Sequence, residues 1–306
     1  MDSNPLSISL AGLELTNPTI LASGILGYTT ESLSRVAKGG AGAVVTKSVG
    51  AAPRTGYANP TVFQAESGLI NAMGLPNPGI EVYAEEIKFS KTVLHIPVIV
   101  SVFGYSAEEY ATVAKKAVEA GADAVELNVS CPHVKQTGAE IGQSPKLLGG
   151  VVLAVKAAVD KPLIVKLSPN VADIAVFAHA AVEAGADALT AVNSVKAMAV
   201  DVETMRPVLS NLKGGLSGPA IKPVALRCVY EIAEVFPDVP VIGCGGISNW
   251  KDAVEFFLAG ASALQIGSAV AENIHVFESV NKGVESYLRK KHFGSVKEIV
   301  GLAHRK

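Results

Sequence analysis

The chain has 306 residues, 49% of them hydrophobic, and a net charge of −2 from 26 basic and 28 acidic residues. A chain of this length can bury roughly 75% of its unfolded surface, so it needs no disulfide framework to hold a core. A near-neutral chain without a basic run also lacks the face that nucleic-acid binding requires.

The predicted strands are short and nearly continuous in apolar character, as strands covered on both faces require. Before them, Leu6–Leu15 alternates apolar and polar residues around Ala11-Gly12 and predicts a β-hairpin. Eight buried strands then follow in chain order: Thr19–Ser23, Ala43–Lys47, Pro97–Val102, Ala124–Asn128, Leu163–Leu167, Ala188–Val192, Val241–Cys244 and Ala263–Ile266.

Helical patterns separate these strands, with apolar residues recurring at three- and four-residue steps. Examples are Ala107–Glu119, Pro145–Val159, Asp173–Glu183, Pro219–Val235 and Trp250–Leu258. An Ala-Gly-Ala motif recurs at three helix-to-strand joints, where Gly121, Gly185 and Gly260 suit a left-handed helix C-terminus.

Eight βα units predict an α/β fold of the TIM (β/α)8 barrel type with an N-terminal β-hairpin. Alternation alone also fits a doubly wound open sheet, which stays as the alternative. We expect one domain, residues 1–306, because no linker interrupts the pattern. Long insertions, Ser48–Gly79 after strand two and Asn193–Gly218 after strand six, are expected on the catalytic face.

The three cysteines, Cys131, Cys228 and Cys244, show no paired spacing and no CxxC motif, which favours a reduced, cytoplasmic setting. The apolar runs are too short for a membrane span. The first ten residues lack the basic and apolar regions of a signal peptide.

Polar residues stand at the carboxyl ends of the predicted strands, the level at which TIM barrels carry their functional groups. Lys47, Asn128, Lys166, Asn193 and Ser194 occupy such positions. Each alone could merely cap a strand, but five at one topological level favour a site.

Glycines follow the last two predicted strands, at Gly245-Gly246 and at Gly267-Ser268. Barrels of this type often bind phosphate there through backbone N–H groups. Steric turns also use glycine. The run at 243–246 lacks the third glycine of a dinucleotide fingerprint, so we predict a phosphate site but no Rossmann motif.

Cys131 follows the fourth predicted strand in Asn128-Val129-Ser130-Cys131-Pro132, on a loop at the barrel mouth. The alternative is a small buried thiol, which is how most free cysteines behave. That interpretation suits Cys228, within a helical pattern, and Cys244 in a strand. The polar and proline neighbours of Cys131 favour a catalytic role.

With these motifs the chain resembles the class 1 dihydroorotate dehydrogenases along almost its whole length. The resemblance lies in Asn71–Leu75 with Pro76–Gly79, in Asn128–Pro132, in Gly214–Ala220 with Ile221–Pro223, in Gly245–Ile247 and in Gly267-Ser268. Val134–Gly138 and Met205–Pro207 resemble the B-type branch, which uses a separate electron-transfer subunit.

The resemblance implies that Cys131 removes the C5 proton of dihydroorotate while a hydride passes from C6 to FMN. Lys166 would lie by the flavin and stabilise negative charge on it. The implied substrate residues are Lys47, Asn71, Ala72, Met73, Gly74, Leu75, Asn128, His133, Asn193 and Ser194. The implied FMN residues are Ser23, Lys47, Ser48, Ser101, Asn128, Lys166, Val192, Gly218, Gly245, Gly246, Gly267 and Ser268.

Two positions depart from the family pattern. His133 stands where the family has Asn two residues after the catalytic cysteine, and Ser101 replaces an Asn common at the end of strand three. These changes affect the expected details of the substrate pocket and of the flavin contacts.

The resemblance further implies one FMN per chain, no metal site, and a partner subunit with FAD and a [2Fe–2S] cluster. Such an assembly would hold two copies of each chain and pass electrons to NAD. The alternatives are an A-type enzyme or another FMN-dependent pyrimidine oxidoreductase without a partner, a Schiff-base lyase using Lys166 or Lys47, and a non-enzymatic binding protein.

Overall fold

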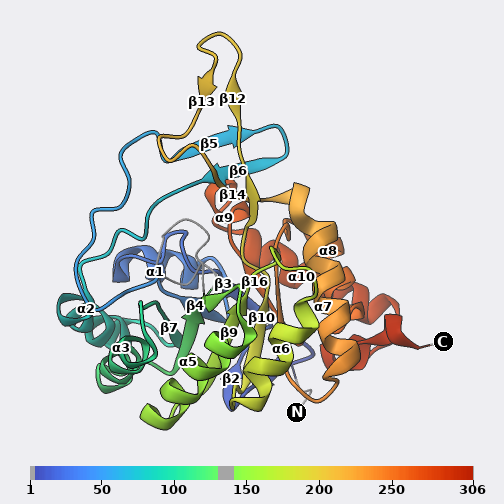
Figure 1. Ribbon diagram of the computed structural model, residues 1–306. Helices are drawn as coiled ribbons and strands as arrows, with labels where there is room; N and C mark the ends of the chain where they lie inside the picture. Colours follow the sequence, from blue (N-terminus) through green and yellow to red (C-terminus); the bar gives the residue numbers. More distant parts are fainter. Residues whose placement is uncertain (1–3, 130–140, 306) are drawn as a thin grey trace.

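The computed structural model describes residues 4–129 and 141–305. Eight parallel strands close into a barrel, and helices surround it (Figure 1). In the order in which they pair around the barrel, the strands are β3 (Thr19–Leu21), β4 (Ala43–Val45), β7 (Val98–Val102), β8 (Ala124–Asn128), β9 (Leu163–Leu167), β10 (Ala188–Ala191), β15 (Val241–Cys244) and β16 (Ala263–Ile266). The predicted TIM barrel is confirmed, and the open-sheet alternative is wrong.

The helices alternate with these strands and cover their outer faces. They are α1 (Thr30–Lys38), α2 (Ile80–Val93), α3 (Ala107–Glu119), α5 (Pro145–Ala158), α6 (Ile174–Glu183), α7 (Lys222–Val235), α8 (Trp250–Leu258), α9 (Ala269–Glu272) and α10 (Val276–Lys290), with short 3-10 turns η1 (Pro219–Ile221), η2 (Val296–Ile299) and η3 (Leu302–His304). None of the helices in the described ranges is long and apolar enough to cross a membrane.

The strands form where apolar residues can be buried on both faces. Every residue of β7 and β9 is buried, including Ser101 and Lys166, whose side chains belong to the barrel interior rather than to solvent. Such polar interruptions in an otherwise apolar strand need internal partners, because burying an unpaired polar group is costly.

The same pair of hydrogen bonds recurs at two of the helix-to-strand joints. Asp123 accepts hydrogen bonds from the Val98 amide at 2.7 Å and from Lys91 Nζ at 2.6 Å. Asp187 repeats both contacts, to the Leu163 amide at 2.8 Å and to Lys156 Nζ at 2.6 Å. Each aspartate thus ties the start of its neighbouring strand to the preceding helix. Gly121 and Gly185, two residues before these aspartates, have a positive φ, as the sequence predicted.

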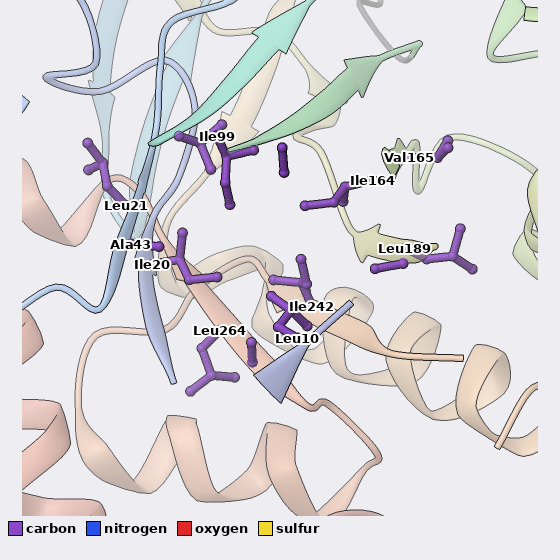
Figure 2. Close-up of a cluster of buried hydrophobic side chains, with 14 of the residues drawn as sticks. Leu10, Ile20, Leu21, Ala43, Ile99, Ile164, Val165, Leu189, Ile242 and Leu264 are labelled. Carbon is purple, nitrogen blue, oxygen red and sulfur yellow. The ribbon is translucent and has the colours of Figure 1, made fainter. Parts of the chain in front are cut away.

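The N-terminal hairpin, β1 (Ile8–Leu10) with β2 (Leu13–Leu15), joins the same hydrophobic core as the barrel strands. Leu10 is fully buried, and Figure 2 shows it among strand side chains such as Ile242 and Leu264. The predicted hairpin is therefore confirmed.

The two long insertions form one antiparallel sheet. The first contributes β5 (Val62–Ala65) and β6 (Gly68–Asn71), and the second contributes β11 (Val195–Ala197) and β14 (Gly214–Ser217). The second insertion also extends a hairpin, β12 (Val200–Asp201) with β13 (Arg206–Pro207), that projects away from the barrel (Figure 1). The sheet lies at the carboxyl ends of the barrel strands, so it covers the predicted catalytic face.

Candidate active site

A cavity of about 350 Å³ opens at the carboxyl ends of the barrel strands, between the barrel and the insertion sheet. Residues of all eight barrel strands or of the loops directly after them contribute to its walls, together with residues of β5, β6 and β14. This is the place where barrels of this fold carry their chemistry.

The cavity brings together nearly all the described residues that the sequence predicted for the site. Those that line it are Ser23, Lys47, Ser48, Asn71, Met73, Gly74, Leu75, Ser101, Asn128, Lys166, Val192, Asn193, Ser194, Gly218, Gly245, Gly246, Gly267 and Ser268. Ala72 does not line it: its side chain is buried with Ile70 and Leu209 in a second small core. Any contact of residue 72 with a ligand would therefore involve its backbone.

Cys131 and His133 lie outside the described residues, as do the neighbouring predictions Ser130, Pro132 and Val134–Gly138. Asn128 at the end of β8 lines the cavity, and Val129 is the last described residue before them. Cys131 thus follows a cavity-lining residue by three positions in the sequence.

A chain of polar side chains crosses one wall. Asn128 Nδ2 donates to Ser48 Oγ at 3.0 Å, and Ser48 Oγ lies 2.8 Å from Ser101 Oγ. Asn193 Nδ2 donates to Asn128 Oδ1 at 3.4 Å. Ser101 is thus part of a connected network that fixes the Asn128 amide.

Lys47 is a half-buried cation at the edge of this network. Burial lowers its pKa, and no carboxylate among the described residues forms an ion pair with it. Asn71 stands on another wall, where its Nδ2 donates to the Gly215 carbonyl at 3.3 Å. A desolvated ammonium without a counter-charge suits an anionic ligand.

The loop after β6 is held by one buried asparagine. Asn77 Oδ1 accepts from the amides of Gly79 at 2.9 Å and Gly50 at 3.2 Å, and its Nδ2 donates to the Leu75 carbonyl at 2.9 Å. These three bonds fix the backbone that places Met73, Gly74 and Leu75 at the cavity.

Lys166 enters the cavity from inside the barrel and is only 5% exposed. Its Nζ donates to Gln265 Oε1 at 2.7 Å and lies 3.8 Å from Glu126 Oε1. Burial alone would lower the pKa of Lys166, but nearby Cys244 and Glu126 raise it, and the net shift is upward. Lys166 is therefore a protonated ammonium near neutral pH.

Glycines form the opposite wall, for two different reasons. Gly245 and Gly246 have φ values of +131° and +77°, and an added Cβ at Gly246 would lie 2.7 Å from Lys222 Cβ. The fold itself requires glycine there. Gly267 is uncrowded: a Cβ would come no nearer than 3.5 Å, to Ala22. A ligand approaching its backbone would explain the missing side chain.

Sequence reasoning missed part of the site. Gln265 and Glu126 fall within predicted strands without a predicted role, and Cys244 was expected to be a buried thiol. Cys244 and Gln265 nevertheless line the cavity beside Lys166. The available signal was a charged or amide side chain inside an apolar strand. The other lining residues that were not predicted are Ala22, Gly24, Ile25, Val62, Leu69, Ser217, Ile221 and Ile247.

Residues 5–288 match the protein family described as dihydroorotate dehydrogenase. The chain belongs to the dihydroorotate dehydrogenase family. The family resemblance predicted from the sequence is thereby confirmed.

Several curated relatives carry the name "Dihydroorotate dehydrogenase B (NAD(+)), catalytic subunit". The chain is 55% identical to the one from Thermococcus kodakarensis over 299 residues, covering 97% of this chain and 98% of the relative. It is 52% identical to the one from Methanosarcina mazei over 300 residues, covering 98% and 95%. These relatives belong to the B-type branch that Met205–Pro207 indicated.

A solved structure shares the fold at much lower identity. It is the crystal structure of DHODH from Eimeria tenella in complex with ferulenol, with a TM-score of 0.86 at 22% identity. The match covers 100% of this chain and 90% of the other. This likeness establishes the barrel architecture independently of the sequence motifs.

Proposed function

We propose that this chain is a single-domain FMN enzyme, residues 1–306, that oxidises (S)-dihydroorotate to orotate in de novo pyrimidine (UMP) synthesis. The observation that carries the proposal is the combination of two cations in one cavity. Lys47 has no ion-pair partner among the described residues, and Lys166 is held protonated in the barrel wall. A substrate carboxylate and an electron-rich cofactor ring would satisfy them respectively.

The residues present fit FMN. The loops after β15 and β16 line one side of the cavity with Gly245, Gly246, Gly267 and Ser268. Backbone N–H groups there can bind a phosphate without any basic side chain. The uncrowded Gly267 supports a ligand that approaches the main chain closely.

FMN, when bound, supplies the acceptor for the hydride that leaves C6 of the substrate. Lys47 would bind the substrate carboxylate, and Asn71, Asn128 and Asn193 would bind its ring carbonyl and N–H groups, since amides both donate and accept. Cys131 would take the C5 proton, which leaves the C5=C6 double bond of orotate. Lys166 would place its positive charge against the flavin.

The proposal includes a partner subunit that carries FAD and a [2Fe–2S] cluster, in an assembly of two copies of each chain. Support comes from the name of these relatives, which calls them catalytic subunits of an NAD-linked enzyme. The B-type run at Met205 also lies on the projecting hairpin, where Met205 is 82% exposed. Val200 and Val202 on the same hairpin are exposed as well, and several exposed apolar residues on one projecting segment suit a contact with another chain.

The partner proposal is tested by NADH formation. Three cysteines, one of them assigned to catalysis, cannot supply the four thiolates of a cluster. We expect the isolated chain to oxidise dihydroorotate with artificial acceptors but to form no NADH at 340 nm until the partner is added. Robust NADH formation by the isolated chain would instead support an enzyme that acts alone, such as an A-type dehydrogenase.

The cofactor proposal is tested by extracting the flavin. One FMN per chain and no FAD is the expected result. A colourless chain would favour the lyase or binding-protein alternatives. The proposed location is the cytoplasm, where a reducing environment keeps a catalytic thiol free.

A further inference from the structure

A buried carboxylate in the barrel wall has no part in the chemistry described so far. Glu126, on β8, is 0% exposed. Its Oε2 accepts hydrogen bonds from Thr190 Oγ1 at 2.9 Å and from Gln265 Nε2. Its Oε1 makes no hydrogen bond within the described residues. A buried charge with an unsatisfied oxygen is unfavourable unless another charge compensates it.

The compensating charge is Lys166. Its Nζ lies 3.8 Å from Glu126 Oε1, and Gln265 bridges the two side chains by accepting from Lys166 at 2.7 Å and donating to Glu126. Lys166 lines the cavity, whereas Glu126 does not. The carboxylate is therefore positioned to act on a ligand only through the ammonium.

Cys244 is the other titratable group that acts on Lys166 among the described residues. The effect of Cys244 on Lys166 requires a thiolate, and burial raises the pKa of this thiol, which disfavours that form near neutral pH. Lys47, across the same cavity, is a cation and cannot serve as a counter-charge. Glu126 is thus the anion that compensates Lys166.

We propose that Glu126 is a positioning residue that keeps Lys166 protonated and fixed before a flavin is reduced, so that the ring meets a permanent positive charge. The inference rests on the proposed FMN site and adds a second residue to it. A lysine without this partner would lose its proton in the buried site and regain it only when the flavin became negatively charged.

The two cases differ in the number of protons taken up with two electrons. With Lys166 always charged, reduction to the anionic flavin takes up one proton. The equilibrium constant for reduction then changes about tenfold per pH unit, which shifts the midpoint potential by about 30 mV. With a lysine that is neutral beforehand, reduction takes up two protons. The equilibrium constant then changes about a hundredfold per pH unit, which shifts the midpoint potential by about 59 mV.

The test is the midpoint potential of the FMN-loaded chain, measured at several pH values near neutrality. We expect the parent to take up one proton with two electrons. In Glu126→Gln the number should rise toward two, because a buried lysine without a counter-charge can titrate as low as about pH 5–6. Thr190→Val removes a hydrogen bond from Glu126 but no charge, and Cys244→Ser removes the competing thiol. Both control variants are expected to take up one proton with two electrons, as the parent does.

Uptake of two protons by the parent, or of only one by Glu126→Gln, on two-electron reduction of the flavin would overturn the inference while leaving the FMN site intact. A switch to two in Cys244→Ser alone would make the thiolate the counter-charge and also overturn it. A parent chain that binds no FMN would overturn the proposed function and this inference with it.

A second variant covers the case in which Glu126→Gln does not fold. The double variant Glu126→Gln/Lys166→Gln removes both charges. If the double variant folds, the uncompensated ammonium was the defect and the pairing is supported. If it also fails to fold, the carboxylate serves the hydrogen bonds to Thr190 and Gln265 instead, and the inference is overturned.

Discussion

Asn128 Nδ2 donates a hydrogen bond of 3.0 Å to Ser48 Oγ, joining two barrel strand ends that are 80 residues apart in the sequence. The bond settles which way the Asn128 amide faces, with its nitrogen toward Ser48 and its oxygen toward Asn193. A substrate therefore meets an amide that is oriented before binding, which reduces the ordering that binding would otherwise require.

Ser48→Ala is expected to lower kcat/KM for dihydroorotate by roughly tenfold. The change leaves the half-buried Asn128 amide without its acceptor, and a hydrogen bond left unmade at a buried group costs about 1–3 kcal/mol. Ser101→Ala is the matched control: it removes the other hydroxyl of the pair but leaves the Asn128–Ser48 bond. Equal losses in steady-state assays of both variants would show that orienting Asn128 is unimportant.

Lys47→Met is expected to raise the KM for dihydroorotate by roughly 10- to 100-fold, the loss of a hydrogen bond to a charged group worth about 1.5–3 kcal/mol. Flavin content should be retained. Burial lowers the pKa of Lys47, so the ammonium is lost at a lower pH than in a free lysine. The parent's KM should therefore rise as the solution becomes alkaline, and Lys47→Met should lack that rise. A parallel rise in both proteins would assign the pH dependence to another group.

Gly267→Ala is expected to weaken FMN binding at least tenfold with little change in the free energy of unfolding. The added methyl group meets only ordinary contact with the protein, at 3.5 Å, but enters the space assigned to the phosphate. Gly246→Ala is the contrasting variant, because its Cβ would collide with Lys222 and its φ is left-handed. It should lower thermal stability. Unchanged FMN affinity in Gly267→Ala would move the phosphate elsewhere.

Cys131→Ala is expected to slow reduction of the bound flavin by dihydroorotate about 10²-fold or more, a typical contribution of a general base. Flavin binding should survive. Cys228→Ala is the control, because this thiol is buried in α7 among core residues and burial raises its pKa to about 11. Stopped-flow bleaching at equal rates in Cys131→Ala and the parent would remove the cysteine from catalysis.

His133→Asn, which introduces the residue that the family resemblance predicts at this position, is expected to retain activity, because both side chains can donate a hydrogen bond. His133→Ala should raise the KM for dihydroorotate. An imidazole can also gain positive charge near pH 6.5, so the test compares the parent with His133→Asn across that pH range. Unchanged KM and kcat in the alanine variant would mean that residue 133 does not contact the substrate.

The barrel could be predicted from the sequence because its strands are buried on both faces. Four of the eight predicted strands, including Leu163–Leu167, have the predicted bounds. Others end early: β4 stops at Val45 and β10 at Ala191. Backbone hydrogen bonds to the neighbouring strands continue past these ends, from Thr46 to Ile99 and from Val192 to Cys244, and the next polar residues, Lys47 and Asn193, line the cavity.

The insertion sheet could not be predicted in the same way. Its register joins Gly215 of the second insertion to Asn71 of the first, 144 residues away in the chain. The Glu126–Lys166–Gln265 group was missed for a related reason. Three separate strands contribute it, and each polar residue alone reads as an isolated interruption of an apolar run.

The most direct test of the proposed function is anaerobic titration of the purified chain with dihydroorotate, followed by the flavin absorbance. The account predicts a yellow protein whose FMN is fully bleached by about one equivalent of dihydroorotate per flavin, with orotate formed in equal amount. A flavin that keeps its oxidised spectrum in the presence of excess dihydroorotate, although dithionite reduces it, would contradict the account.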